Sequence, residues 1–218
     1  MRIRTVLTIN VGIGLGKLTC DVLISNLNYL RMLDLSKLDL CVVLHLIGEL
    51  KHLRYLDLSR NINIKLLPNS ITKLLNLQTL KLSDCHSLKE LPMGIKKLVN
   101  LKHLDVICCF ELTHMPLGLG NLTCLEILTQ FVVCQEGFKD SFGSWYKKKQ
   151  VMSGGGLSEL KELTNLGGSL FISFLGHGED DMVECKAKNM KEKQHLQELK
   201  LWWDGKGECY NEMLLEGL

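Results

Sequence analysis

The sequence predicts an α/β solenoid, in which coils of a repeated unit stack and each coil adds one strand to a common parallel sheet. A leucine pattern, L-x-x-L, returns every 24 residues and begins at Leu53, Leu77, Leu101 and Leu125. The three prolines of the chain have the same spacing, at Pro68, Pro92 and Pro116. A repeat of this length indicates one supersecondary unit per period, which must stack on its neighbours to bury its apolar edge.

A third observation concerns the turn after each predicted strand. The pattern L-x-x-L-x-L is followed by a residue that is Asn or Cys in three units, at Asn61, Cys85 and Cys109. A period of about 20 to 29 residues with this ending is the signature of leucine-rich repeats. We therefore expect a right-handed horseshoe with the sheet on its concave face and short helical or irregular segments on its convex face. The three turn residues should lie inside the corner, where they help to satisfy turn amides that water does not reach.

Strand residues between the buried leucines should point to water on the concave face, because side chains alternate along a strand. Stacking aligns these residues in three columns. The first is Arg31, Arg54, Gln78, Lys102 and Glu126; the second is Met32, Tyr55, Thr79, His103 and Ile127; the third is Asp34, Asp57, Lys81, Asp105 and Thr129. The second column is the least charged and is flanked by mixed charges, which is more typical of a protein interface than of a nucleic-acid surface.

The sequence therefore predicts that a protein partner docks on the concave face, with Tyr55 and His103 near the centre. Of Trp202 and Trp203, one should pack inward and the other face out, and we assign the outward position to Trp202 as a further anchor. The candidate protein-binding residues are Arg54, Tyr55, Asp57, Thr79, Lys81, Lys102, His103, Asp105, Ile127 and Trp202.

Composition narrows the class of protein. The 218-residue chain is 46% hydrophobic and 23% charged, as in an ordinary globular or repeat domain. Its net charge is +2 without a clustered basic excess, so nucleic acid and anionic membranes are not expected as partners. None of its nine cysteines forms a C-x-x-C pair, and we expect reduced, mostly buried thiols. Because no secretory signal or long apolar run is recognised, the expected location is the cytoplasm.

Two motifs that suggest a ligand fail on geometry. The segment Asn10–Thr19 is like a phosphate-binding loop, but Val11 and Leu18 stand where that motif needs a glycine and a hydroxyl. His103 and Cys109 should face opposite sides of a strand, so they cannot converge on one zinc ion. No set of residues with a known catalytic spacing is recognised. We therefore predict no metal, no cofactor and no enzymatic activity.

The sequence divides into four segments. Residues 1–26 are expected to form a partial or irregular repeat, and residues 27–133 the regular repeats. Residues 134–156 mix polar residues, isolated aromatics and glycines, which indicates an exposed loop. Residues 157–218 resume irregular repeats that look truncated at the C terminus. Strands are expected within 163–175, with one extra residue, and within 192–203.

The regular block closely resembles the leucine-rich repeats of plant intracellular disease-resistance receptors of the coiled-coil, nucleotide-binding type. The phrases that carry the resemblance are HLRYLDLS at 52–59, LPNSITKLLNLQTLKLSDC at 67–85, LKELPMGIKKLVNLKHLDV at 88–106 and LTQFVV at 128–133. The phrase KEKQHLQELKL at 191–201 is similar to the same group. In such receptors a connection like residues 134–156 separates two blocks of repeats.

The resemblance implies a non-catalytic recognition module in plant defence. Such a module would sense a pathogen effector or a host protein, and in a full receptor it would also restrain the nucleotide-binding domain, which this sequence lacks. We expect a monomer that binds protein partners. Two alternatives stay open, a leucine-rich-repeat scaffold outside immunity and a non-functional fragment of a receptor gene.

Overall fold

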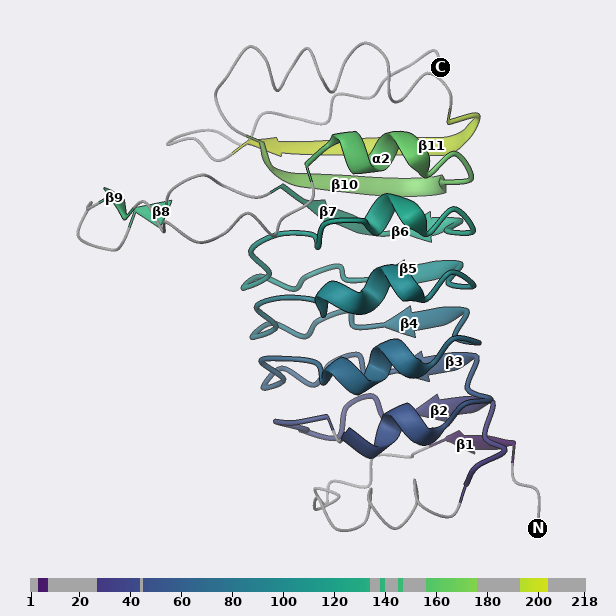
Figure 1. Ribbon diagram of the computed structural model, residues 1–218. Coiled ribbons are helices and arrows are strands. Elements are labelled where there is room, and N and C mark those ends of the chain that lie inside the picture. Colours follow the sequence, from purple (N-terminus) through teal and green to yellow (C-terminus); the bar gives the residue numbers. More distant parts are fainter. Residues whose placement is uncertain are drawn as a thin grey trace.

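The computed structural model describes residues 4–7, 27–43, 45–133, 138–139, 145–146, 156–175 and 193–203. Over this part of the chain, successive coils stack in sequence order, with strands on one side and helical turns on the other (Figure 1). This arrangement is a leucine-rich-repeat solenoid and confirms the predicted fold class. Strands and turns predominate, and the helices are few and short.

Six short strands form one parallel sheet in the order of the sequence. They are β1 (Thr5–Leu7), β2 (Met32–Asp34), β3 (Tyr55–Asp57), β4 (Thr79–Lys81), β5 (His103–Asp105) and β6 (Ile127–Leu128). The register places equivalent residues of the repeat side by side, because Leu80 pairs with Leu56 on one side and Leu104 on the other. The common alternation of the strands therefore directs the core leucines to one side of the sheet and the polar residues to the other.

Short 3₁₀ helices lie on the side away from the strands (Figure 1). They are η1 (His45–Glu49), η2 (Asn69–Lys73), η3 (Met93–Lys97) and η4 (Leu119–Asn121). Pro68 and Pro92 directly precede η2 and η3, and the proline ring fixes their φ angles, which are −68° and −58°. Each of these two helices buries one isoleucine, Ile71 or Ile95, against the core.

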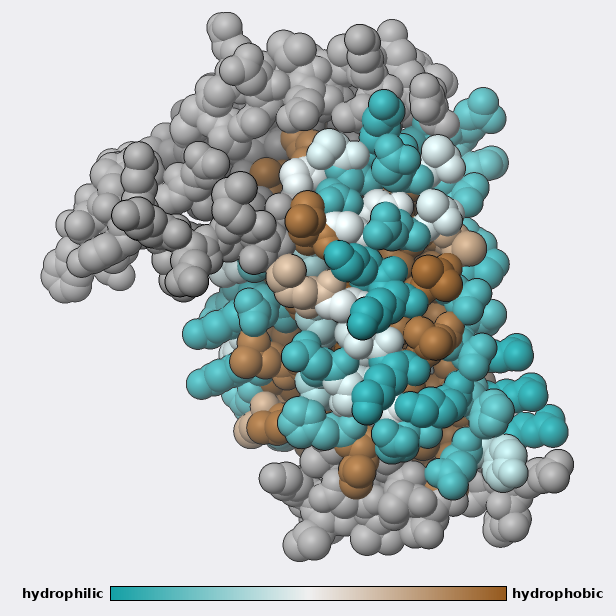
Figure 2. All heavy atoms as spheres, viewed as in Figure 1, coloured by the Kyte–Doolittle hydropathy of each residue, from teal (hydrophilic) through white to brown (hydrophobic). Residues whose placement is uncertain are grey.

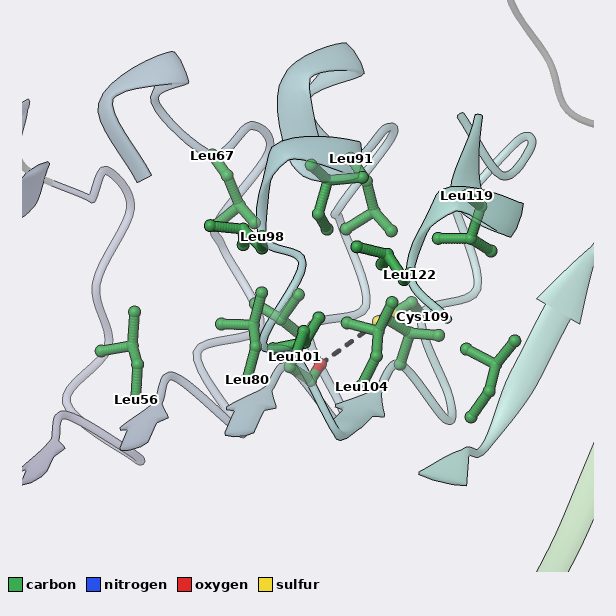
Figure 3. Close-up of a cluster of buried hydrophobic side chains, with 14 of the residues drawn as sticks. Leu56, Leu67, Leu80, Leu91, Leu98, Leu101, Leu104, Cys109, Leu119 and Leu122 are labelled. Carbon is green, nitrogen blue, oxygen red and sulfur yellow. Dashed lines mark hydrogen bonds between the residues drawn. The ribbon is translucent and has the colours of Figure 1, made fainter. Parts of the chain in front are cut away.

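The core fills the space between the strands and the helical turns. Leucines from successive coils lie one beside the next and point inward, with Cys109 among them (Figure 3). Leu80, Leu98 and Leu104 have no exposed surface. One coil covers only one flank of its own leucines, so the next coil must remove the other flank from water, and stacking is the main stabilising interaction.

Asn61 is fully buried in the corner after β3, where its side chain bonds to the chain of the preceding coil. Its Oδ1 accepts from the backbone N–H groups of Leu38 (3.1 Å) and Leu40 (3.0 Å). Its Nδ2 donates to the carbonyls of Leu35 (2.9 Å) and Leu58 (2.7 Å). The prediction that Asn61 satisfies turn amides is confirmed. Its bonds to the two carbonyls were not predicted.

Cys85 and Cys109 occupy the same corner in the next two coils. The Cys85 thiol donates to the carbonyl of Leu58 (3.3 Å), and the Cys109 thiol to the carbonyl of Leu82 (3.2 Å). Burial raises the pKa of Cys85 to about 11, an effect that the backbone N–H of Asn61 partly opposes, and burial raises the pKa of Cys109 to about 12. Both cysteines therefore stay protonated at neutral pH and act as carbonyl caps as well as apolar fillers, a role that the sequence did not indicate.

A second parallel sheet continues the solenoid. It has the order β11 (His195–Trp203), β10 (Gly167–Leu175) and β7 (Gln130–Val132), so the two strands expected after the loop are present. The N–H of Gly167 donates to the carbonyl of Glu126 (2.8 Å), which joins β10 to the first block. The register of β10 against β11 shifts between Gly168 and Ser169, and the φ of Gly168, 70°, is in the left-handed region that favours glycine.

Two polar side chains tie the second block to the first. The helix α2 (Ser158–Glu162) presents Glu159, whose carboxylate accepts from the backbone N–H groups of Gly118 (2.8 Å) and Gly120 (2.7 Å). On the strand side, the Gln130 amide donates to the Ser173 hydroxyl (3.0 Å) in a buried contact. These contacts replace the regular side-chain pattern where the period of the repeat is lost.

Within the predicted exposed loop, β8 (Phe138–Lys139) and β9 (Trp145–Tyr146) form an antiparallel pair that the sequence did not predict. Three stretches lie outside the described residues. They are the segment like a phosphate-binding loop at 10–19, the three lysines at 147–149 and the final segment 204–218.

Candidate functional site on the sheet face

The outward residues of β1–β6, with the residue just before each strand, form one continuous surface that we call the sheet face. Strand pairing places Tyr55 beside Thr79, Thr79 beside His103, and His103 beside Ile127. Met32 pairs with Tyr55 in the same way, so the five residues of the predicted central column are neighbours in space. Because Arg54 and Lys102 stand immediately before their strands, they lie along one edge of this column.

The exposure of the candidate residues differs from the prediction in one case. Asp57 was expected to face water, but only 8% of its surface is exposed. The reason is that its carboxylate lies between the Tyr55 hydroxyl and the backbone of the next turn. Exposed candidates are Arg54, Lys102, Ile127 and Trp202, and half-buried ones are Tyr55, Thr79, Lys81, His103 and Asp105.

Tyr55 is the centre of a fixed polar cluster. Its hydroxyl donates to Asp57 Oδ2 (3.0 Å), while Asp57 Oδ1 accepts from the N–H of Ser59 (2.9 Å). The Lys81 ammonium lies 5.9 Å from the centre of the Tyr55 ring, within the range of a cation–π contact. Burial, followed by the hydrogen bond to Asp57 and the negative charges of Asp57 and Asp34, raises the pKa of Tyr55 to about 12. The phenol therefore remains a neutral donor.

A second cluster surrounds Glu126 at the other end of the column. Lys102 Nζ lies 2.6 Å from Glu126 Oε1, and His103 Nε2 lies 3.8 Å from Glu126 Oε2. The hydrogen bond from Lys102 lowers the pKa of Glu126, and the same contact raises the pKa of Lys102. Such exposed pairs contribute little to stability, but they fix the direction in which the side chains point. Glu126 was not among the candidate residues, although its place in the first column, beside two basic residues, signals this contact.

Asp105 and Thr129 complete the ordered surface. The Thr129 hydroxyl donates to Asp105 Oδ1 (2.9 Å) and accepts from the N–H of Val106 (2.9 Å). Because β6 ends at Leu128, the N–H of Val106 bonds to this side-chain hydroxyl and not to a backbone carbonyl of the next coil. The aspartates and the threonine of the third column are therefore held by hydrogen bonds to the backbone.

Trp202 is not part of this cluster. It lies on β11 with 45% of its surface exposed, and β10 separates β11 from the first block. The structure therefore brings together nine of the ten candidates and places Trp202 apart from them. The side chain of Trp203 lies outside the described residues.

The opposite surface is formed by η1–η4. Hydrophilic side chains cover most of it, with hydrophobic ones scattered among them (Figure 2). Among the described residues no three His, Cys, Asp or Glu side chains are arranged to hold a metal ion. Within the same residues no helix is long and apolar enough to cross a membrane.

A fixed array of donors, acceptors and apolar groups on an open sheet suits the binding of a protein surface. Residues 12–216 match the family model described as a leucine-rich repeat region. The chain belongs to the leucine-rich-repeat family, whose repeats generally serve as non-catalytic scaffolds for protein interaction. No curated protein has significant similarity to the sequence.

Among the solved structures that are similar to this chain are the following three, and the first, with a TM-score above 0.5, shares the fold. A leucine-rich-repeat protein of Leptospira interrogans has 21% identity and a TM-score of 0.52, over 81% of this chain and 46% of that one. The plant peptide hormone receptor RGFR1 in complex with RGF2 has 22% identity and a TM-score of 0.38, over 81% and 32%. The TLR13–ssRNA13 complex has 19% identity and a TM-score of 0.33, over 82% and 30%. The chain thus spans less than half the length of each.

Proposed function

We propose that this chain is the protein-recognition module of a plant intracellular immune receptor and that it senses a pathogen effector or a host protein through its sheet face. The observation that carries the binding surface is the adjacent column of Tyr55, Thr79, His103 and Ile127, flanked by charges that are held in place. The link to plant defence rests on the sequence phrases that resemble those receptors. The proposed location is the cytoplasm, and the proposed state is a monomer.

The physical basis of recognition is pre-organisation. Side chains already fixed by contacts such as Tyr55 to Asp57 and Lys102 to Glu126 lose little freedom when a partner docks. Ile127, which is 39% exposed, adds apolar area that a partner would remove from water. The surface therefore combines a partly apolar, weakly charged centre with a charged rim, which resembles the composition of protein interfaces.

The test uses proteins captured by the intact chain from infected plant tissue. Each captured protein is purified, and its affinity is measured for the wild-type chain and for two double variants. Tyr55→Ala/His103→Ala should weaken binding by about 1 to 2 kcal/mol per residue. Lys73→Ala/Lys97→Ala, on the surface formed by η1–η4, should leave it unchanged. Binding that survives the first pair and is lost with the second contradicts the proposed surface.

The identity of the captured proteins tests the biological role. A pathogen effector, or a host protein that effectors modify, supports the immune function. Host signalling proteins with no defence component favour a scaffold outside immunity. Sequencing the 5′ end of the transcript adds an independent result, because an upstream in-frame nucleotide-binding domain would place the chain in a receptor. A scarce transcript together with an insoluble chain favours a non-functional gene fragment.

A further inference from the structure

Three arginines stack at one edge of the sheet face, at the N-terminal end of the solenoid. Arg4, Arg31 and Arg54 each stand immediately before a strand, β1, β2 or β3. The Arg31 N–H donates to the Arg4 carbonyl (2.7 Å), and the Arg54 N–H donates to the Arg31 carbonyl (2.8 Å). The three residues are therefore direct neighbours across the strands, and all are exposed. We call this set the arginine ladder.

The charge of the ladder is not neutralised within the part of the chain that the structure describes. No described carboxylate forms an ion pair with any of the three arginines. Further along the same column, Gln78 is neutral, and Glu126 neutralises Lys102 at 2.6 Å. Positive charge is thus concentrated at one end of the column, although the whole chain carries a net charge of only +2.

Acidic residues limit where an anionic partner can lie. Asp34 and Asp57 belong to the third column, and their carboxylates accept from the backbone N–H groups of Ser36 (2.8 Å) and Ser59 (2.9 Å). These fixed negative charges would repel an acidic partner placed over the third column. An acidic partner is therefore confined to the edge formed by the ladder.

The spacing of the ladder indicates the shape of the partner. Neighbouring strands lie about 4.8 Å apart, so the arginines repeat at about that distance. Side chains three or four residues apart on a helix are about 5 to 6 Å apart, whereas same-face residues of an extended peptide are about 6.8 Å apart. Carboxylates along one face of a helix therefore match the ladder better than those of an extended chain.

An aromatic pair lies beside the ladder. The rings of Tyr29 and His52 are stacked, with centroids 5.8 Å apart and an interplanar angle of 10°. These residues precede Arg31 and Arg54 by two positions, and 52% of the surface of Tyr29 is exposed. The pair offers an apolar platform on which the aliphatic carbons of a bound helix can rest.

We propose that the arginine ladder binds an acidic helix of the partner protein, with carboxylates at positions i, i+4 and i+7 facing Arg4, Arg31 and Arg54. Each guanidinium offers a planar pair of donors that matches a carboxylate. The inference rests on the proposed function of the sheet face and adds the chemistry of the partner.

The probe is a fluorescent alanine-based helical peptide with Glu at i, i+4 and i+7, and its binding to the intact chain is measured by anisotropy. Arg31→Gln/Arg54→Gln should weaken binding by about tenfold. The matched control is Lys65→Gln/Lys89→Gln, because these exposed lysines are also backbone neighbours (3.1 Å) and their loss removes the same charge. The control should bind as tightly as the wild type.

Three results would overturn the proposal. One is equal binding by the wild type and the arginine double variant. Another is equal binding of a peptide with the same composition whose Glu residues are spread around the helix. The third is an oligothymidine that binds more tightly than the peptide and depends on the same arginines, since this would assign the ladder to nucleic acid.

The capture experiment separates this idea from the proposed function. In one outcome, Tyr55→Ala/His103→Ala abolishes binding of the captured partner, and Arg31→Gln/Arg54→Gln changes the binding of neither the partner nor the peptide. The role proposed for the arginine ladder is then wrong, and the proposed function is supported. In another outcome, Arg31→Gln/Arg54→Gln weakens binding of both the partner and the peptide, and Tyr55→Ala/His103→Ala changes neither. The role of the arginine ladder is then supported, and the proposed centre of the interface at Tyr55 and His103 is wrong.

Discussion

The coils before and after residues 134–155 use the same backbone pairing but different side chains. At the start of each strand a backbone N–H donates to a carbonyl of the previous coil. The N–H of Glu126 donates to the carbonyl of Lys102 (2.8 Å), and the N–H of Gly167 donates to the carbonyl of Glu126 (2.8 Å). The first of these steps spans 24 residues and the second 41. The same backbone contact is therefore made although the number of residues between the two partners differs.

The core differs between the two regions. The position filled by Leu98 in a regular coil is again a leucine, Leu163, in the first coil after the insertion. In the second it is Lys193, which is buried and donates to the carbonyl of Leu163 (2.7 Å). In the last coil before the insertion, Gln130 fills the position of Val106 and is also buried. The coils on both sides thus bury leucines, and those near and after the insertion add hydrogen-bonded polar groups, which are costly if any partner is lost.

The largest expected effect is in the regular core. Leu80→Asp places a carboxylate among fully buried leucines and should reduce the free energy of unfolding by about 3 to 5 kcal/mol, or unfold the chain. The matched control is Lys97→Asp on the exposed side of η3, which should change it by less than about 0.5 kcal/mol. Urea denaturation measures both. Equal shifts would mean that the inward and outward positions are assigned wrongly.

Asn61 provides the next largest effect. Asn61→Leu roughly keeps the volume but leaves the N–H groups of Leu38 and Leu40 without their acceptor. It should reduce the free energy of unfolding, measured by urea denaturation, by about 3 kcal/mol. Asn63→Leu is the control, because Asn63 is exposed in the same turn and should cost less than about 0.5 kcal/mol. A loss at Asn61 no larger than that at Asn63 would show that the buried amide contributes nothing.

The regular block could be predicted from the sequence because its signal is periodic. Leu80 and Lys81 differ by one position in a strand of known alternation, so one is core and the other faces the partner side. Asn61 was predictable because the position recurs in each unit. The burial of Asp57 was not, since it depends on where the Tyr55 hydroxyl lies, and alternation says nothing about that contact.

The contacts across the insertion could not be predicted either. Glu159 bonds to Gly118 and Gly120, which lie 41 and 39 residues earlier, and neither separation is a multiple of the period. The donors are backbone N–H groups, which have no sequence signature. The same holds for Gln130 and Ser173, 43 residues apart.

A smaller effect is expected at the contact between the blocks. Glu159→Gln keeps the shape but replaces one acceptor by a donor that faces an N–H group, and it should cost about 1 to 2 kcal/mol. Glu162→Gln, at the exposed end of the same helix, is the control. Denaturant midpoints compare the two. Equal midpoints would show that the carboxylate of Glu159 does not couple the blocks.

The smallest effect concerns the two buried thiols. Their pKa values of about 11 and 12 in the folded chain lie above the ordinary value of 9.0, so unfolded thiols lose protons first. Their contribution is complete below pH 9 and is lost as the pH rises toward 11 to 12. At pH 9 the loss should be under about 1 kcal/mol, allowing for solvent screening.

Cys85→Ala/Cys109→Ala tests this sign. Between pH 8 and pH 10 its free energy of unfolding should fall less steeply than that of the wild type, although the variant is less stable at pH 8. Urea titrations at each pH measure both slopes. Parallel slopes would mean that the thiols are not shielded from water in the folded state.

The central claim is that the coils on both sides of the insertion form one solenoid, and amide hydrogen exchange followed by NMR tests it most directly. The Phe171 N–H donates to the Thr129 carbonyl (3.1 Å) across the junction, whereas the Glu126 N–H donates within the regular block. Protection of Phe171 should be within roughly tenfold of that of Glu126, and Glu159→Gln should lower it. Rapid exchange at Phe171 beside full protection at Glu126 would contradict the claim, because the blocks would then open independently.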